Sequence, residues 1–298
     1  MTNELAGNWV LASIPAKDRR RLAAQLEPVS LKFGQILYEA GGKIRHVYFP
    51  LNSLISLLTA VDKRRSLEVG MVGNEGMTGM PFVLGIGESG VRALVQGAGN
   101  ALSMPAASFR IEFDRNQPLR QALFRYTYAL MAQISQTAAC NRFHEAEQRL
   151  ARWLLMTRER VGSNEFPMTH EFLAHMLGVR RGGVTEAASA LKSRGLIDYH
   201  RGKIQILDAK GLKRSACSCY QIVKAAFDRA QKLSPLGCPV SLEQPEIEQQ
   251  ESYVGGNPQR LRQRLRVGGR RHIRRVAAPV YPKRHGGAIE RSSERQSA

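Results

Sequence analysis

The chain has 298 residues, of which 43% are hydrophobic, and this length allows about two domains with buried cores. No apolar run reaches the roughly 18 residues of a membrane span, and the N-terminus lacks the basic start of a secretory signal peptide. Four cysteines make no disulfide framework, so we expect a cytoplasmic protein without a membrane partner. The net charge of +19 favours a polyanionic partner.

The first part of the chain is predicted to form short strands after a helix near residues 17–26. Apolar and polar residues alternate in several short segments, and glycines separate them at nearly regular intervals. These segments are residues 29–33, 46–50, 54–59, 66–72, 91–96 and 101–104. No helix-length pattern interrupts them, which favours a β-roll or small barrel over a parallel sheet with crossover helices.

After Pro118 the hydrophobic period becomes that of a helix, which is expected to continue to about residue 147. Its main apolar stripe is Leu119, Leu123, Tyr126 and Leu130, and a second stripe adjoins it. The helix could pack wholly against its own β-roll. Two stripes exceed what one roll can cover, however, so we predict a symmetric homodimer through the Leu119–Leu130 stripe.

Two short helices joined by a tight turn are predicted next. Thr169 is a candidate N-cap of the first helix, and Gly178 ends it as a left-handed residue would. The second helix turns small and apolar residues inward: Val184, Ala187, Ala188 and Leu191. This pattern indicates a helix-turn-helix, in which Arg180, Arg181 and Thr185 lie at the end that meets DNA bases.

A two-stranded hairpin follows over residues 195–207, with Gly202 in its turn. Such a hairpin would be the wing of a winged helix-turn-helix. It would place His200, Arg201 and Lys203 where DNA phosphates pass.

This order of parts resembles the Crp/Fnr family of bacterial transcription regulators. The resemblance covers roughly residues 10–232 and is specific to a less-studied branch. The strings that carry it are HVYFPLNSLISLL, VGNEGMTGMPFVLG, ACNRFHEAEQRLARWLLMTRERVG, EFLAHMLGVRR and CSCYQIVKAAFDR. It implies an α+β protein with a cyclic-nucleotide-binding-like roll over 10–116, a dimerisation helix over 117–147 and a winged helix-turn-helix domain with a C-terminal helix over 148–232.

The resemblance implies a sequence-specific regulator that binds a two-fold symmetric double-stranded operator as a homodimer, with RNA polymerase as a further partner. Arg181 falls where the family's guanine-reading arginine lies, whereas Gly182 and Glu186 depart from the family pattern. No P-loop, Rossmann fingerprint or catalytic constellation is present, so no enzyme is expected. The expected DNA-binding residues are Thr169, His170, Arg180, Arg181, Thr185, Lys192, Arg201 and Lys203.

An effector on the β-roll is expected to differ from a cyclic nucleotide. Nucleotide-binding members of the family use a Gly-Glu pair and an Arg followed by Ser or Thr. The nearest matches here are Gly73 with Glu75, across a longer loop, and Arg92 with Ala93, which lacks the hydroxyl. Glu75 and Arg92 are therefore candidates either for an unknown effector or for a structural ion pair.

The four cysteines are expected to be buried structural thiols. Cys217 and Cys219 form a C-x-C pair, a poor spacing for zinc ligands even with Cys140 and Cys238 added. The family's iron–sulfur members carry their cysteines near the N-terminus, where this chain has none. His144 and the other histidines also lack metal-ligand spacing. No metal and no cofactor are expected.

Residues 233–298 fall outside the resemblance and are predicted to be a disordered basic tail. Twelve Lys and Arg residues stand against three acidic residues over 251–298, among many glycines and prolines. The charge fits either a solvated tail or a non-specific clamp on phosphates. The alternative function is therefore a ligand-sensing or RNA-binding protein whose tail provides non-specific affinity for nucleic acid.

Overall fold

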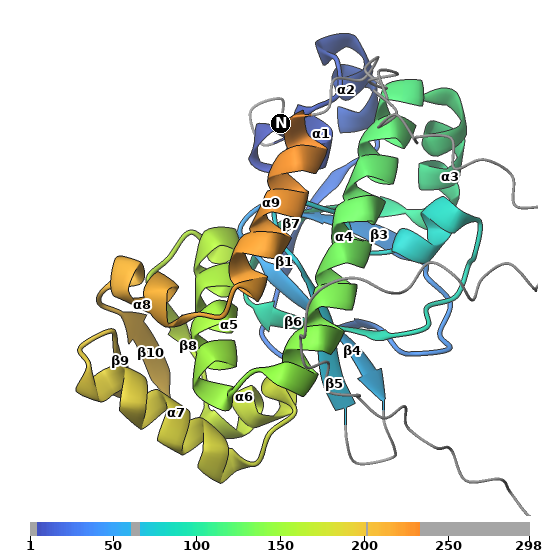
Figure 1. Cartoon of the computed structure of the whole chain (residues 1–298). Coiled ribbons are helices and arrows are strands. Elements are labelled where there is room, and N and C mark those ends of the chain that lie inside the picture. Colours follow the sequence, from blue (N-terminus) through green and yellow to red (C-terminus); the bar gives the residue numbers. More distant parts are fainter. Residues whose placement is uncertain (1–4, 61–65, 201, 233–298) are drawn as a thin grey trace, which may run out of the picture. The chain divides into compact units, whose positions relative to one another are not determined.

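Two antiparallel sheets form the N-terminal part of the computed structural model, which describes residues 5–60, 66–200 and 202–232 (Figure 1). Their strands are β1 (Glu27–Leu31), β2 (Ile36–Tyr38), β3 (His46–Pro50), β4 (Leu54–Ala60), β5 (Ser66–Val72), β6 (Arg92–Gly97) and β7 (Gly99–Pro105). One sheet has the order β1-β7-β3 and the other β2-β6-β4-β5, with every pairing antiparallel. The predicted β-roll is confirmed, although the three-residue β2 was not predicted.

Short helices flank the roll. They are η1 (Leu5–Gly7), α1 (Trp9–Ala12), α2 (Ala16–Ala23), η2 (Met80–Leu84) and α3 (Ala106–Arg115). The helix predicted near 17–26 is α2, which ends at Ala23. Among the described residues, no helix is both long and apolar enough to cross a membrane.

The long helix α4 spans Gln117–Phe143. Asn116 caps its start, because the side-chain oxygen accepts a hydrogen bond from the Leu119 amide at 3.0 Å, and Pro118 lies in the first turn. The helix ends before the expected residue 147, and α5 (Ala146–Val161) begins after a break at His144 and Glu145. The predicted dimerisation segment therefore includes the start of a second helix.

The stripe Leu119, Leu123, Tyr126 and Leu130 is buried inside the subunit. The C-terminal helix α9 (Cys219–Lys232) lies beside α4 in Figure 1 and packs against it, and β5 also contacts α4. The Tyr126 ring lies 6.3 Å from that of Phe227 on α9, and it approaches Gly76 so closely that a Cβ there would overlap the ring.

This burial corrects the prediction that the Leu119–Leu130 stripe meets a second copy. A hydrophobic period shows which helix face is apolar but not what covers it. The large apolar side chains that α4 exposes lie on another face and are Phe124, Tyr128, Met131 and Phe143.

The remaining elements form a winged helix-turn-helix. They are β8 (Glu165–Pro167), α6 (His170–Leu177), α7 (Arg181–Ser193), β9 (Ile197–His200), β10 (Lys203–Ile206) and α8 (Ala209–Ser215). The predicted hairpin β9–β10 is present, and β8 adds a third strand in the order β8-β10-β9. The α+β class is thus confirmed. The predictions for Arg201 and for residues 233–298 lie outside the described residues.

Candidate DNA-binding site

The first helix of the motif has a defined start and end. The Thr169 hydroxyl accepts a hydrogen bond from the Phe172 amide at 3.1 Å, which makes it the predicted N-cap of α6. Gly178 ends the helix with φ of +61°, the left-handed conformation that favours glycine. Both sequence predictions for this helix are confirmed, and together they direct the chain into α7.

Helix α7 buries one face and exposes the other. Val184, Ala187, Ala188 and Leu191 are buried against the rest of the domain, as predicted. Arg180, Arg181 and Thr185 are exposed at the opposite face. Ser189, which the sequence analysis missed, continues this face one turn after Thr185, and the helical period alone could have identified it.

The N-terminal end of α7 concentrates positive charge. Arg180 is its N-cap residue and Arg181 its first residue. Within the described ranges, neither guanidinium takes part in an ion pair or a side-chain hydrogen bond. The helix dipole adds partial positive charge at the same end. Two unpaired cations there disfavour the isolated helix and favour an anionic partner.

Thr185 and His170 belong to a small cluster that joins the motif to its wing. His170 Nδ1 lies 3.0 Å from Thr185 Oγ1, and Thr185 donates to the Arg181 carbonyl at 3.1 Å. The His170 ring stacks on Tyr199 of β9 with centroids 4.2 Å apart. Burial and the Arg181 charge lower the pKa of His170 below its usual value, so the ring is neutral at pH 7. His170 therefore braces α6, α7 and β9.

The two predicted lysines each pair with a carboxylate at the surface. Lys192 Nζ lies 2.7 Å from Asp198 Oδ1, and this contact lowers the pKa of Asp198. Lys203 Nζ lies 3.0 Å from Glu165 Oε1. All four side chains are exposed, where an ion pair contributes little to stability, so a phosphate can displace the carboxylate. Lys192 lies in the last turn of α7, at the end opposite the arginines.

Comparison with known proteins agrees with this geometry. Residues 148–215 match the family of Crp-like helix-turn-helix domains. This range of the chain includes α6, α7 and the wing. This part of the chain therefore belongs to the family of Crp-like helix-turn-helix domains, in agreement with the resemblance that the sequence indicates. No curated protein matches the sequence.

Solved structures share the fold of this chain at low identity. A Eubacterium rectale protein described as a Crp/Fnr-family regulator is 18% identical with a TM-score of 0.55, and the match covers 69% of this chain and 96% of that one. FixK2 from Bradyrhizobium japonicum is 14% identical with a TM-score of 0.56, covering 64% and 98%. A Silicibacter pomeroyi protein described as a cAMP-binding regulator is 17% identical with a TM-score of 0.51, covering 72% and 97%.

The two predicted effector residues do not pair with each other. Glu75 is buried and pairs with Arg160 at 2.8 Å. Arg92 is exposed and pairs with Glu39 at 2.7 Å. The ion pair between Glu75 and Arg92 is therefore not formed, and effector binding by these residues stays a prediction.

Cavities in the described part of the chain differ greatly in size. A cavity between the β2-β6-β4-β5 sheet and the segment 77–81, beside Tyr38, Leu57 and Met77, has a volume of about 30 Å³, enough for about one water molecule. A larger one of about 340 Å³ is lined by Glu75, Arg160 and residues of α9 that include Tyr220 and Phe227.

Four further side chains converge at the end of α4, from segments that precede and follow α7 in the sequence. Cys140, His144, Cys217 and Cys219 present their ligand atoms within 4.8 Å of one another. The sequence analysis expected buried structural thiols, because the C-x-C spacing is poor for zinc ligands, and it did not connect His144 with them. These three thiols are buried and free, and the fold brings them together with His144 in one cluster.

Proposed function

We propose that this Crp/Fnr-family regulator binds a two-fold symmetric operator as a homodimer, with α7 in the major groove. The observation that carries the proposal is the exposed start of α7, where Arg180 and Arg181 have no partner among the described side chains. Arg181 is assigned to a guanine edge, since bidentate arginine–guanine contact is the commonest specific pairing. Lys192 and Lys203 are assigned to phosphates.

The exposed face of α4 supports the dimer. Phe124, Tyr128 and Met131 follow one another at helical spacing, and each is more than half exposed in the single subunit. A contiguous apolar face of this kind marks an interaction surface. A second copy related by a two-fold axis would cover both faces at once and would set the two α7 helices at half-sites about 34 Å apart.

A small-molecule effector is a further part of the proposal. The cavity of about 340 Å³ lies within the usual size range of ligand pockets, roughly 300–1,000 Å³. Its walls come from the turn that holds Glu75, from α5 and from α9, so a ligand there would contact both the roll and the helices. The roles of residues 10–116 as sensor, 117–147 as dimer helix and 148–232 as DNA-binding domain belong to the proposal, as does contact with RNA polymerase.

The test is binding to an operator selected from random duplexes, to its single-base variants and to unrelated duplex, each across a salt series. Arg181→Ala should cost about 1–3 kcal/mol and relax preference at one base pair. Lys203→Ala should weaken all duplexes alike and lower the salt slope by about one. Arg110→Ala, at an exposed position on α3, is the matched control and should change neither. Equal losses on every duplex for Arg181→Ala would contradict the assignment.

A further inference from the structure

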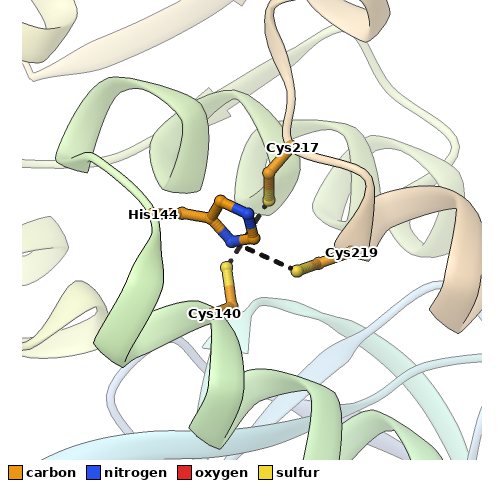
Figure 2. Close-up of side chains that lie close together, drawn as sticks. All are labelled: Cys140, His144, Cys217 and Cys219. Carbon is orange, nitrogen blue, oxygen red and sulfur yellow. Dashed lines mark hydrogen bonds between the residues drawn. The ribbon is translucent and has the colours of Figure 1, made fainter. Parts of the chain in front are cut away.

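Two helices bring four metal-binding side chains together at the end of α4. Cys140 lies in the last turn of α4, and His144 follows four residues later as its C-cap, so both fall on one side of the helix. Cys217 lies between α8 and α9, and Cys219 is the first residue of α9. Figure 2 shows the three thiols and the imidazole pointing toward one common point.

The distances in the cluster fit one tetrahedral ion. Cys140 Sγ lies 3.5 Å from Cys217 Sγ, and Cys219 Sγ lies 3.4 Å from His144 Nδ1. A zinc–sulfur bond of about 2.3 Å in a tetrahedron places neighbouring ligand atoms roughly 3.8 Å apart. The three thiols are free, and their separation exceeds the roughly 2.05 Å of a disulfide. An iron–sulfur cluster needs thiolates on different irons, hence a wider set of ligands.

The surroundings of the cluster favour negative charge. Arg149 and Arg152 on α5 are almost fully buried, and neither forms an ion pair with a carboxylate in the described residues. The Nε atom of each lacks a hydrogen-bond partner. Buried arginines require a counter-charge.

We propose that Cys140, His144, Cys217 and Cys219 form a closed site for a single zinc ion. Three thiolates and one divalent cation carry a net charge of −1, which offsets one of the two positive charges of Arg149 and Arg152. Four protein ligands leave no open position, so the ion is structural. It ties the start of α9 and the preceding linker to the end of α4.

Arg149 extends the influence of this site to the helix-turn-helix. Its Nη2 donates to Asn141 Oδ1 at 2.8 Å and also to the carbonyl of Leu177, the last residue of α6. Without the ion the thiolates would take up protons, which would leave Arg149 without a counter-charge and would alter its hold on the α6–α7 turn. This consequence rests on the proposed function, because it concerns DNA binding. The metal content of the chain is measured without DNA and does not depend on that function.

The experiment measures metal in the reduced full-length chain. Elemental analysis should find one zinc per chain, and replacement by Co²⁺ should give a thiolate charge-transfer band and tetrahedral ligand-field bands. Cys219→Ser and His144→Asn should lose the ion or weaken it measurably in competition with a chromophoric chelator. His144→Cys should keep a tetrahedral ion with four thiolates, which separates ligand loss from misfolding. Cys238→Ser and His46→Asn are the matched controls and should bind as the parent chain does.

Arg152→Met tests the counter-charge separately and should weaken zinc affinity by roughly 10–100-fold, as other residues behind the ligands do. A reduced chain that contains no metal and gives no thiolate band with Co²⁺ would overturn the proposal. An anaerobic preparation with two or more irons per chain and the visible absorption of an iron–sulfur cluster would also overturn it. If zinc binds but metal removal leaves operator affinity unchanged, the site stands and only its coupling to α6 is wrong.

Discussion

Arg160 donates from Nε to Oε1 of Glu75 at 2.8 Å, and both side chains are almost inaccessible to solvent. The guanidinium also donates to Gln133 Oε1 at 3.2 Å and to the Met156 carbonyl at 3.1 Å, while the carboxylate accepts from the Gly73 amide. This buried ion pair therefore joins a turn of the roll to α4 and α5. The other polar atoms of the Glu75 and Arg160 side chains also have hydrogen-bond partners.

Glu75→Gln should destabilise the fold by about 3–5 kcal/mol, because it leaves the buried guanidinium of Arg160 without a counter-charge. Chemical denaturation followed by circular dichroism measures this change. Glu39→Gln removes a similar partner from the exposed Arg92 and should cost less than about 1 kcal/mol. Equal costs for the two variants would contradict a structural role for the Glu75–Arg160 pair.

Glu68 should make stability depend on pH. It is fully buried, accepts hydrogen bonds from Ser56 at 2.6 Å and from Trp153 Nε1 at 2.9 Å, and burial raises its pKa from 4.5 to about 7. Between these values the unfolded chain ionises while the folded chain keeps the proton, so unfolding releases a proton and stability falls as pH rises. The loss over that window is about 3 kcal/mol.

Denaturation curves from pH 4.5 to 8, followed by tryptophan fluorescence, measure this dependence. Glu68→Gln should remove it, so that the variant gains stability relative to the parent chain as pH rises. A difference between the two chains that stays constant across this range would show that Glu68 does not titrate as described.

Met131→Glu should dissociate the proposed dimer without unfolding the subunit, because Met131 is 63% exposed on the free face of α4. Sedimentation velocity at micromolar concentration measures the association state. Ile111→Glu places the same charge on an exposed apolar position of α3 and should leave the dimer intact. A parent chain that sediments as a monomer, or a Met131 variant that remains a dimer, would remove this face from the proposal.

Cyclic AMP and cyclic GMP should not bind tightly. The cavity beside Tyr38 and Met77, of about 30 Å³, is far smaller than a nucleotide, and Ala93 supplies no hydroxyl for a phosphate. Isothermal titration calorimetry of the full chain should detect no heat of binding at micromolar concentrations. Micromolar affinity for either nucleotide would contradict this expectation.

Local chemistry made much of the fold predictable from the sequence. The caps at Thr169 and Gly178 and the inward residues of α7 are determined by neighbours within one or two turns. The strands of the roll follow from alternation in the same way. These features need no knowledge of distant partners, and the structure has them where they were expected.

Long-range packing explains what could not be predicted. Leu123 and Tyr126 carry the apolar period of a dimer helix, but α9 returns from nearly a hundred residues later and covers them. Cys140 and His144 stand four residues apart, which the sequence analysis did not recognise as a ligand pair, and Cys217 and Cys219 join them only because α9 packs on α4. Sequence spacing describes ligands on one element and says little about a site shared by two.

Gly182 and Gly183 occupy the first turn of α7, and a Cβ added at either would meet nothing within 4 Å. No packing constraint in the described structure requires glycine there, while each glycine weakens a helix by about 1 kcal/mol relative to alanine. In the proposed complex these positions face the major groove. A single substitution could therefore stiffen the helix and add a base contact in the same step, so the set of genes under control can diverge between descendants without passing through a less stable protein.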